Sequence, residues 1–161
     1  MSKHKLILED VFEEVSYILF AIHCSLVDYR LAYLLNKNLA TNLIRKKEDL
    51  DYDNVTASYS IFEWEDIDHL TTWNLINNKS LYETDNIMDE TSLFGKDEIS
   101  FKTHNLILEY KNVDYFLKIS AEGMFSSEKA ILNKIQEIPQ IVTAYMIDAT
   151  KLKSRNNLIF N

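Results

Sequence analysis

Glycine and proline are almost absent from this chain, and their scarcity constrains the fold more than any other feature. The 161 residues include two glycines, Gly95 and Gly123, and one proline, Pro139. Loops that hold the phosphates of nucleotides need several glycines, because the backbone must approach the anion closely. The sequence therefore excludes Walker-type and dinucleotide-type nucleotide sites.

Turns in such a chain must use other residue types. Asparagine tolerates a positive φ better than most residues, so it is the natural substitute for glycine. We expect Asn77-Asn78 and Asn156-Asn157 to form turns.

The length and composition predict one domain that spans residues 1–161. A chain of this size buries about two-thirds of its unfolded surface. Hydrophobic residues make up 47% and charged residues 26% of the chain, which argues against disorder and against a membrane protein. The apolar run at residues 6–8 is too short for a signal peptide, and the single cysteine, Cys24, fits a reducing compartment. We therefore expect a cytoplasmic location.

Charge is distributed unevenly along the chain. The whole sequence has 17 basic and 25 acidic residues, and residues 48–98 alone carry 14 acidic and 2 basic ones. A net charge of −8 argues against general attraction to nucleic acid, which depends on basic side chains. We interpret the acidic segment as a solvated surface, with orientation on a charged partner as the alternative.

The apolar pattern predicts many strands and two helices. Short runs in which apolar and polar residues alternate, or in which all residues are apolar, are typical of strands. They cover residues 4–9, 15–24, 42–46, 56–64, 69–77, 104–110, 113–120 and 141–147. Helical spacing covers 26–39, after Ser25 as the expected N-cap, and a segment that begins at Ser126 or Ser127 and ends before Pro139. We expect loops at 48–54 and, as an acidic loop or insertion, at about 78–100.

This order of elements predicts an α+β fold. Two pairs of neighbouring strands, 56–64 with 69–77 and 104–110 with 113–120, are expected to form hairpins. The sheet is then mainly antiparallel, and the two helices pack on one face of it. The segment from the second helix through Pro139 to Tyr145 resembles the second half of ACT-like and related ferredoxin-like domains, which implies a sandwich of that type.

A short sequence pattern resembles the signature of a protein family. Ile107 and Glu109 are followed, after three residues, by Val113-Asp114-Tyr115, and Leu108 stands where the signature has proline. This pattern resembles the IPExxxVDY family of small, uncharacterised Bacteroidetes proteins. Other segments, such as Asp28–Leu31 and the C-terminal Leu158-Ile159-Phe160, are similar as well. The resemblance implies a cytosolic bacterial protein and carries no catalytic residues over to this chain.

No combination of residues predicts a reaction centre, so we assign no catalytic, cofactor-binding or metal residues and expect no enzyme. Cys24 precedes the first helix, but strand neighbours point to opposite faces, so His23 does not face it and Cys24 is expected in the core. The densest group of acids and imidazole is Glu63, Glu65, Asp66, Asp68 and His69. Without a nearby glycine or a second histidine at ligand spacing, we interpret it as a solvated hairpin tip, with a metal site as the alternative.

Three polar residues of the first helix are candidate structural anchors. Asp28, Arg30 and Asn36 lie on it, and Asp28 cannot pair with Arg30 because only positions three or four apart meet. We expect Arg30 to pair with Glu109 or Asp114 inside the fold. Recognition of a ligand carboxylate by Arg30 is the alternative.

Aromatic residues are the remaining candidates for function. They include Tyr17, Tyr29, Tyr33, Tyr59, Phe62, Trp64, Trp73, Tyr115 and Phe116. Most are expected in the core, but an exposed group would mark a surface for a partner. Acidic residues surround Trp64 and Trp73, which disfavours RNA and favours a protein.

Three hypotheses for function remain. The first is a non-catalytic protein-interaction or regulatory module, with a homodimer formed through an open sheet face or edge among its forms. The second is an ACT-like domain that senses a small ligand. The third is a ribosome- or RNA-associated factor that uses Arg45-Lys46-Lys47 and the basic residues at 151–155.

Overall fold

A six-stranded antiparallel sheet forms the centre of the molecule. The computed structural model describes residues 17–52, 55–84, 100–123 and 127–160. Across the sheet the strands follow the order β10 (Thr143–Ile147), β1 (Tyr17–His23), β9 (Tyr115–Ala121), β6 (Thr71–Asn77), β5 (Ile61–Asp66) and β2 (Ile44–Arg45). The predicted strand at 4–9 lies outside the described residues.

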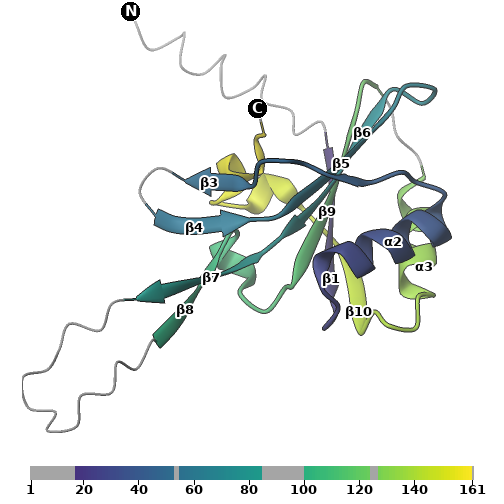
Figure 1. The fold of residues 1–161 in the computed structure, drawn as a ribbon. Helices are drawn as coiled ribbons and strands as arrows, with labels where there is room; N and C mark the ends of the chain where they lie inside the picture. The colour runs from purple at the N-terminus through teal and green to yellow at the C-terminus, as the bar shows by residue number, and fades with distance from the viewer. Residues whose placement is uncertain (1–16, 53–54, 85–99, 124–126, 161) are drawn as a thin grey trace, which may run out of the picture.

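Two helices, α2 (Asp28–Leu39) and α3 (Glu128–Gln136), cover one face of this sheet (Figure 1). Four neighbouring strands of the sheet follow the order β10-β1-β9-β6. Along the chain, α2 lies between β1 and β6, and α3 lies between β9 and β10. That is the split β-α-β arrangement of the ferredoxin-like sandwich. The predicted α+β class, with two helices on one face of a mainly antiparallel sheet, is confirmed.

Successive side chains of a strand point to opposite faces of the sheet, so the molecule has two separate hydrophobic cores. On β1, Phe20 and Ile22 face the helices, whereas Leu19 and Ala21 face the other way. The helix side buries apolar side chains of both layers, among them Leu31, Leu35, Leu75, Leu117 and Ile135. Burying such residues supplies most of the free energy that holds the helices on the sheet.

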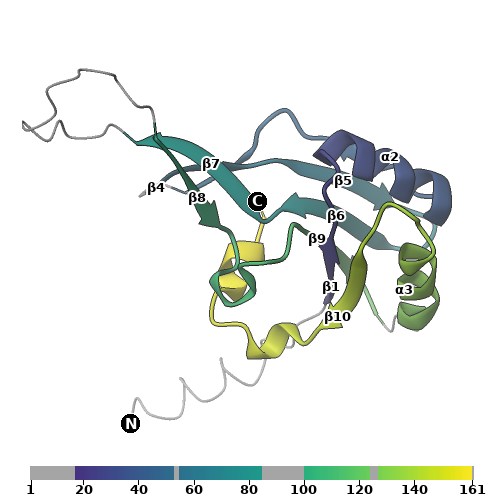
Figure 2. The ribbon, with the colours of Figure 1, turned by 90° about the horizontal axis from the view of Figure 1, so that it is seen from below.

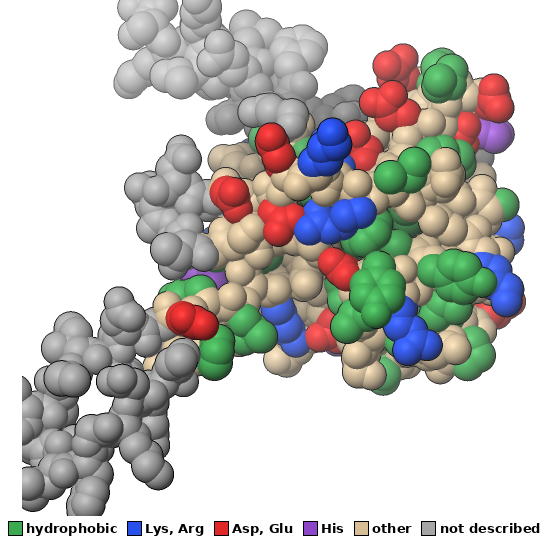
Figure 3. All heavy atoms as spheres, viewed as in Figure 1, with side chains coloured by type: hydrophobic (Ala, Val, Ile, Leu, Met, Phe, Trp, Pro, Cys, Tyr) green, Lys and Arg blue, Asp and Glu red, His purple; other side chains and the backbone are tan. Residues whose placement is uncertain are grey.

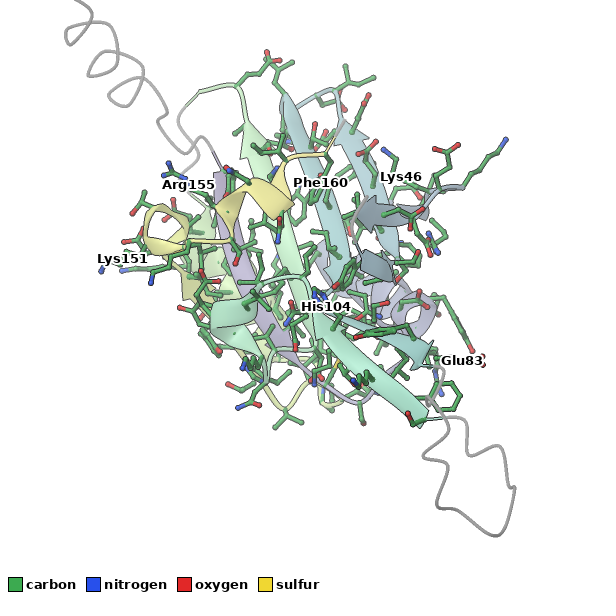
Figure 4. The ribbon with its side chains drawn as sticks, turned by 90° about the vertical axis from the view of Figure 1, so that its left-hand side faces the viewer. Lys46, Glu83, His104, Lys151, Arg155 and Phe160 are labelled. Atoms are coloured by element: carbon green, nitrogen blue, oxygen red, sulfur yellow. The ribbon has the colours of Figure 1, made fainter. Side chains whose placement is uncertain are left out.

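Irregular segments, not helices, cover the opposite face. They are the 3-10 turns η1 (Leu108–Tyr110), η2 (Ala149–Lys151) and η3 (Arg155–Leu158), with the residues between them. Leu106, Ile107, Leu152 and Leu158 are buried against the sheet there. Figure 2 shows the C-terminal segment on the side of the sheet away from α2 and α3, and Figure 4 shows it face-on with Arg155 and Phe160.

Two small ribbons extend the fold beyond the main sheet. One pairs β3 (Leu50–Tyr52) with β4 (Val55–Tyr59), and the other pairs β7 (Lys79–Thr84) with β8 (Ser100–Asn105) and projects from the body (Figure 1). The predictions of loops at 48–54 and 78–100 are therefore wrong where these strands lie. Residues 85–99 are outside the described part of the chain.

The predicted hairpin of residues 104–110 with 113–120 is also wrong. β9 pairs with β1 and β6, and residues 100–105 pair with β7 instead. The apolar pattern of 104–110 reflects burial of Leu106 and Ile107 under an irregular segment, and burial alone does not distinguish a strand from such a cover.

Asn156-Asn157 lie in the 3-10 turn η3, as predicted for a turn, but the positive φ values fall on other residues. Positive φ occurs at Ala40 and Leu70 among the non-glycine residues described, and Asn78 is fully buried in place of forming an exposed turn. Ser25 is not the cap of α2, which begins after Val27 without a side-chain cap bond.

Candidate functional site

Glu109 holds the C-terminal segment. Its Oε1 accepts hydrogen bonds from the backbone N–H groups of Lys153 and Ser154, at 2.7 and 2.9 Å. Partial desolvation on its own raises the pKa of Glu109, but the hydrogen bonds it accepts outweigh this effect and lower its pKa below the ordinary value. This carboxylate therefore satisfies backbone donors of an irregular segment.

Asp114 and Tyr115 anchor the start of β9 to the residues before α2. Asp114 Oδ2 accepts from the Cys24 backbone N–H at 3.0 Å, and its Oδ1 accepts from Lys79 Nζ at 2.8 Å. The Tyr115 hydroxyl donates to the Leu26 carbonyl at 2.7 Å. Burial, followed by the nearby Cys24, Asp28 and Asp114, raises the pKa of Tyr115, so this phenol remains protonated.

Asn78 is the anchor that the sequence did not indicate. Its fully buried side chain donates to the carbonyls of Tyr110 and Val113 at 2.9 and 2.8 Å, and accepts from the Ile107 N–H at 2.9 Å. The Asn78 backbone also bonds Leu106 N–H and Asp114 C=O. The side chain and backbone of Asn78 thus give the backbone of residues 106–114 hydrogen-bond partners that a neighbouring strand would otherwise provide.

Lys118 is a second buried polar residue missed by sequence reasoning. Its Nζ donates to the Leu158 carbonyl at 2.5 Å and lies 4.7 and 4.6 Å from the ring centroids of Tyr17 and Phe160. Burial lowers the pKa of Lys118, although the carbonyl and both rings favour the charged ammonium. The ammonium is occupied by these contacts, so it acts as an internal tie for the C-terminal segment.

Cys24 and His23 do not form a nucleophilic pair. Cys24 is buried on the helix side, and desolvation is the main reason that the pKa of its thiol is raised. His23 Nε2 lies 3.1 Å from the Tyr145 hydroxyl. A protonated, buried thiol is a poor nucleophile, which agrees with core packing.

The acidic tip of the β5–β6 hairpin is held by local bonds. Asp66 Oδ2 lies 2.7 Å from His69 Nδ1, and Glu63 accepts from Asn74 Nδ2 at 3.0 Å. Within the described ranges, no three His, Cys, Asp or Glu side chains converge in a way that could hold a metal ion.

Two members of the basic triplet have acidic partners. Arg45 pairs with Asp49, and Lys46 Nζ lies 3.4 Å from Glu63 Oε2. These pairs reduce the positive field that the triplet offers to phosphates.

Trp64 and Trp73 do not form an exposed platform. Trp73 is buried in the helix-side core, and its Nε1 donates to Thr71 Oγ1 at 3.0 Å. Trp64 is half-buried, with its ring centroid 5.9 Å from that of Trp73. The prediction that Trp73 offers a surface to partners is wrong, because the pleat of β6 turns it toward the helices.

The three polar residues of α2 separate into different roles. Asn36 bonds the Leu43 backbone through both amide atoms and accepts from the Thr41 hydroxyl, so it fixes the turn after the helix. Asp28 accepts from the Tyr29 N–H at 2.7 Å in the first helical turn.

Arg30 does not have its predicted partner. It is exposed and makes no ion pair with any residue of the described ranges, while Glu109 and Asp114 bond elsewhere. The prediction of an internal anchor at Arg30 is wrong, because α2 turns this position away from the sheet.

The outer side of α2 is the aromatic surface that the structure exposes. Tyr29 and Tyr33 lie one helical turn apart and are 66% and 64% exposed, and Arg30 and Lys37 are exposed beside them. Figure 3 shows hydrophobic and basic side chains next to each other over α2. We call these four residues the α2 surface; a helical wheel of 26–39 could have indicated it, because none of the four shares the face of Leu31 and Leu35.

The α2 surface suits contact with another macromolecule. Tyrosine rings give apolar contact area together with a polar hydroxyl, and arginine binds carboxylates in a bidentate way. No helix in the described part of the chain is long and apolar enough to cross a membrane. No family model, curated protein or solved structure matches this chain.

Proposed function

We propose that this protein is a non-catalytic interaction module that binds a protein partner through the α2 surface. The observation that carries the proposal is the exposed pair Tyr29 and Tyr33 beside two exposed cations, Arg30 and Lys37. Tyrosine and arginine are enriched among the residues that dominate binding energy at protein interfaces.

Charge determines the kind of partner. The chain has eight more acidic than basic charges, yet Arg30 and Lys37 make no ion pair within the described ranges. Asp28, half-buried at the start of α2, is the one acidic residue of the helix. A partner segment that presents carboxylates and apolar side chains is therefore complementary to this surface.

The hydrogen bonds of polar side chains within the fold support a role without catalysis. Glu109, Asp114, Tyr115 and Lys118 all use their polar atoms in hydrogen bonds within the fold. We infer that the residues shared with the IPExxxVDY signature maintain this fold, and we propose that the chain belongs to this family.

Affinity capture with surface variants tests the proposal. Wild-type protein, Tyr29→Ala/Tyr33→Ala and Arg30→Glu/Lys37→Glu are immobilised and exposed to native lysate of the source cells. The matched control is Leu81→Ala/Phe101→Ala, which removes exposed apolar side chains from the β7–β8 ribbon. We expect wild type and control to capture the same acidic proteins, and both α2 variants to lose them.

The loss of affinity expected from the tyrosine substitutions can be estimated from known protein interfaces. Truncating a central tyrosine costs about 2 kcal/mol or more, roughly a 30-fold loss of affinity. Unchanged capture by the α2 variants, or no specific capture by wild type, would contradict the proposal. All variants should keep the wild-type melting temperature, because the altered side chains are exposed.

A further inference from the structure

Among the described residues, no strand pairs with the outer side of β10, and this sheet edge lacks the usual protection against pairing. The main sheet ends at β2 on one side and at β10 on the other. β2 has two residues and is followed by Lys46 and Lys47, so it is short and charged. Natural sheets protect their edges with charges, proline, bulges or short strands, because an unpaired edge invites another strand.

β10 has none of these devices. It has five residues, its pairing with β1 runs without a bulge, and no charged residue occurs between Glu137 and Asp148. The single proline, Pro139, precedes the strand. Apolar side chains are exposed along this edge, with Val142 82% and Met146 49% accessible.

The backbone of β10 presents hydrogen-bonding groups outward. Ile22 C=O accepts from Asp114 N–H at 3.2 Å, so Ile22 directs its polar groups toward β9. Ala144, its partner on β10, must direct its own N–H and C=O away from β1, and so must Met146 two residues later. Gln136 Nε2 donates to the Ala144 carbonyl at 2.8 Å, which occupies one of these groups with a side chain that can move aside.

The distribution of charge favours a second copy of the chain as the occupant. The acidic side chains of β5 and its hairpin tip, Glu63, Glu65, Asp66 and Asp68, lie several strands away from β10 (Figure 2). Two copies joined at β10 place these side chains at opposite ends of the combined sheet. Their mutual repulsion, which matters between two chains of net charge −8, is then weak.

We propose that two copies of this protein pair through β10, antiparallel and related by a two-fold axis at Tyr145. Ala144 of one copy then lies opposite Met146 of the other. The N–H and C=O groups of both residues exchange hydrogen bonds across the axis, after Gln136 releases the Ala144 carbonyl. The combined sheet is continuous, both copies keep α2 on an outer layer, and the pairing does not depend on the α2 surface.

Analytical ultracentrifugation over a series from micromolar to submillimolar protein tests the pairing. Wild type should dimerise, and Met146→Lys should be monomeric, because each copy would bring a charge to the same edge. Leu81→Lys, at a site 71% exposed on the β7–β8 ribbon, is the matched control and should dimerise like wild type. A monomeric wild type, or a Met146→Lys protein that dimerises unchanged, would overturn the proposal.

A cross-linking experiment tests the register. In a Cys24→Ala background, Tyr145→Cys places two thiols opposite each other in a non-hydrogen-bonded pair, where Cα atoms are about 4.5 Å apart and a disulfide can form. Thr143→Cys is the control, because Thr143 would lie opposite Ile147 of the second copy. We expect a covalent dimer from Tyr145→Cys alone; equal cross-linking of both variants, or of neither, would overturn the pairing as stated.

Discussion

The two faces of the central sheet are covered in different ways. On one face, α2 and α3 satisfy their own backbone hydrogen bonds and contribute mainly apolar side chains, such as Leu31, Leu35 and Ile135. On the other face, the segments around η1 to η3 have little regular structure, and their backbone groups need partners from side chains. Asn78, Glu109 and Lys118 supply them.

This difference explains why Asn78 and Lys118 are buried. A helix needs only an apolar stripe to pack on a sheet, whereas an irregular cover also needs specific donors and acceptors. Asn78, Glu109 and Lys118 therefore maintain the structure of the irregular cover. The comparison predicts that substitutions of similar volume cost more on the irregular side, where they also remove hydrogen-bond partners of the backbone.

The largest expected effect is at Asn78. Asn78→Leu leaves the Ile107 N–H and the Val113 carbonyl unpaired and removes one of the two hydrogen bonds to the Tyr110 carbonyl, which should lower the free energy of unfolding by about 3–5 kcal/mol. On the helix side, Leu35→Met conserves volume and should cost less than about 1.5 kcal/mol. Urea unfolding monitored by circular dichroism measures the free energy of unfolding of both variants. Equal losses of stability would contradict the difference between the two faces.

A smaller effect, with a diagnostic pH dependence, is expected at Lys118. Lys118→Met removes the donor to Leu158 C=O and should cost about 1–2 kcal/mol at pH 7. Burial lowers the pKa of Lys118 in the folded protein, so the unfolded chain holds this proton more tightly. The stability of wild type relative to the variant should therefore rise with pH, from the folded pKa up to the unfolded value of about 10.4.

Unfolding in urea at several pH values between 7 and 10.5 checks this expectation. Lys134→Met, at an exposed position of α3, is the control and should show no such trend. If the stability difference at Lys118 falls as pH rises, the ammonium is stabilised by its site, and our account of its burial is wrong.

The smallest expected effect is at Glu109. Glu109→Gln weakens the acceptor for Lys153 and Ser154 N–H and should cost about 1 kcal/mol at pH 7. The pKa of Glu109 is lowered in the folded protein, so its contribution is present above the unfolded pKa and is lost as pH falls through the folded value. Wild type and variant should then become equally stable in acid.

Thermal unfolding from pH 7 down to pH 3 measures this convergence. Glu122→Gln is a suitable control, because the Glu122 side chain is exposed and makes no hydrogen bond within the described ranges. If the stability difference between wild type and Glu109→Gln persists unchanged in acid, the charge of the Glu109 carboxylate does not stabilise the C-terminal segment.

Sequence patterns predicted the regular part of the fold well. The strand at 15–24, the helices at 26–39 and after Ser127, and the strand at 141–147 all occur close to their predicted positions. These elements have a repeated apolar period that local packing enforces. The hairpin predicted for 104–120 failed, because Leu106 and Ile107 are buried by a segment whose backbone is satisfied by the distant Asn78.

The candidate surface was only partly predictable. Arg30, Tyr29 and Tyr33 were among the candidate residues, and a helical wheel separates them from the face of Leu31 and Leu35. Nothing local showed that Trp73 points to the helices. The outward direction of a side chain depends on which face of the helix or strand meets the rest of the fold.

The sequence by itself determined the α+β class, the absence of glycine-rich phosphate loops and the concentration of acidic charge in 48–98. These properties follow from residue type and short-range period. The tertiary structure alone decided that Asn78 and Lys118 are buried anchors and that β10 ends the sheet of the described residues. Each of these depends on contacts between segments far apart in the chain, and no local pattern encodes them.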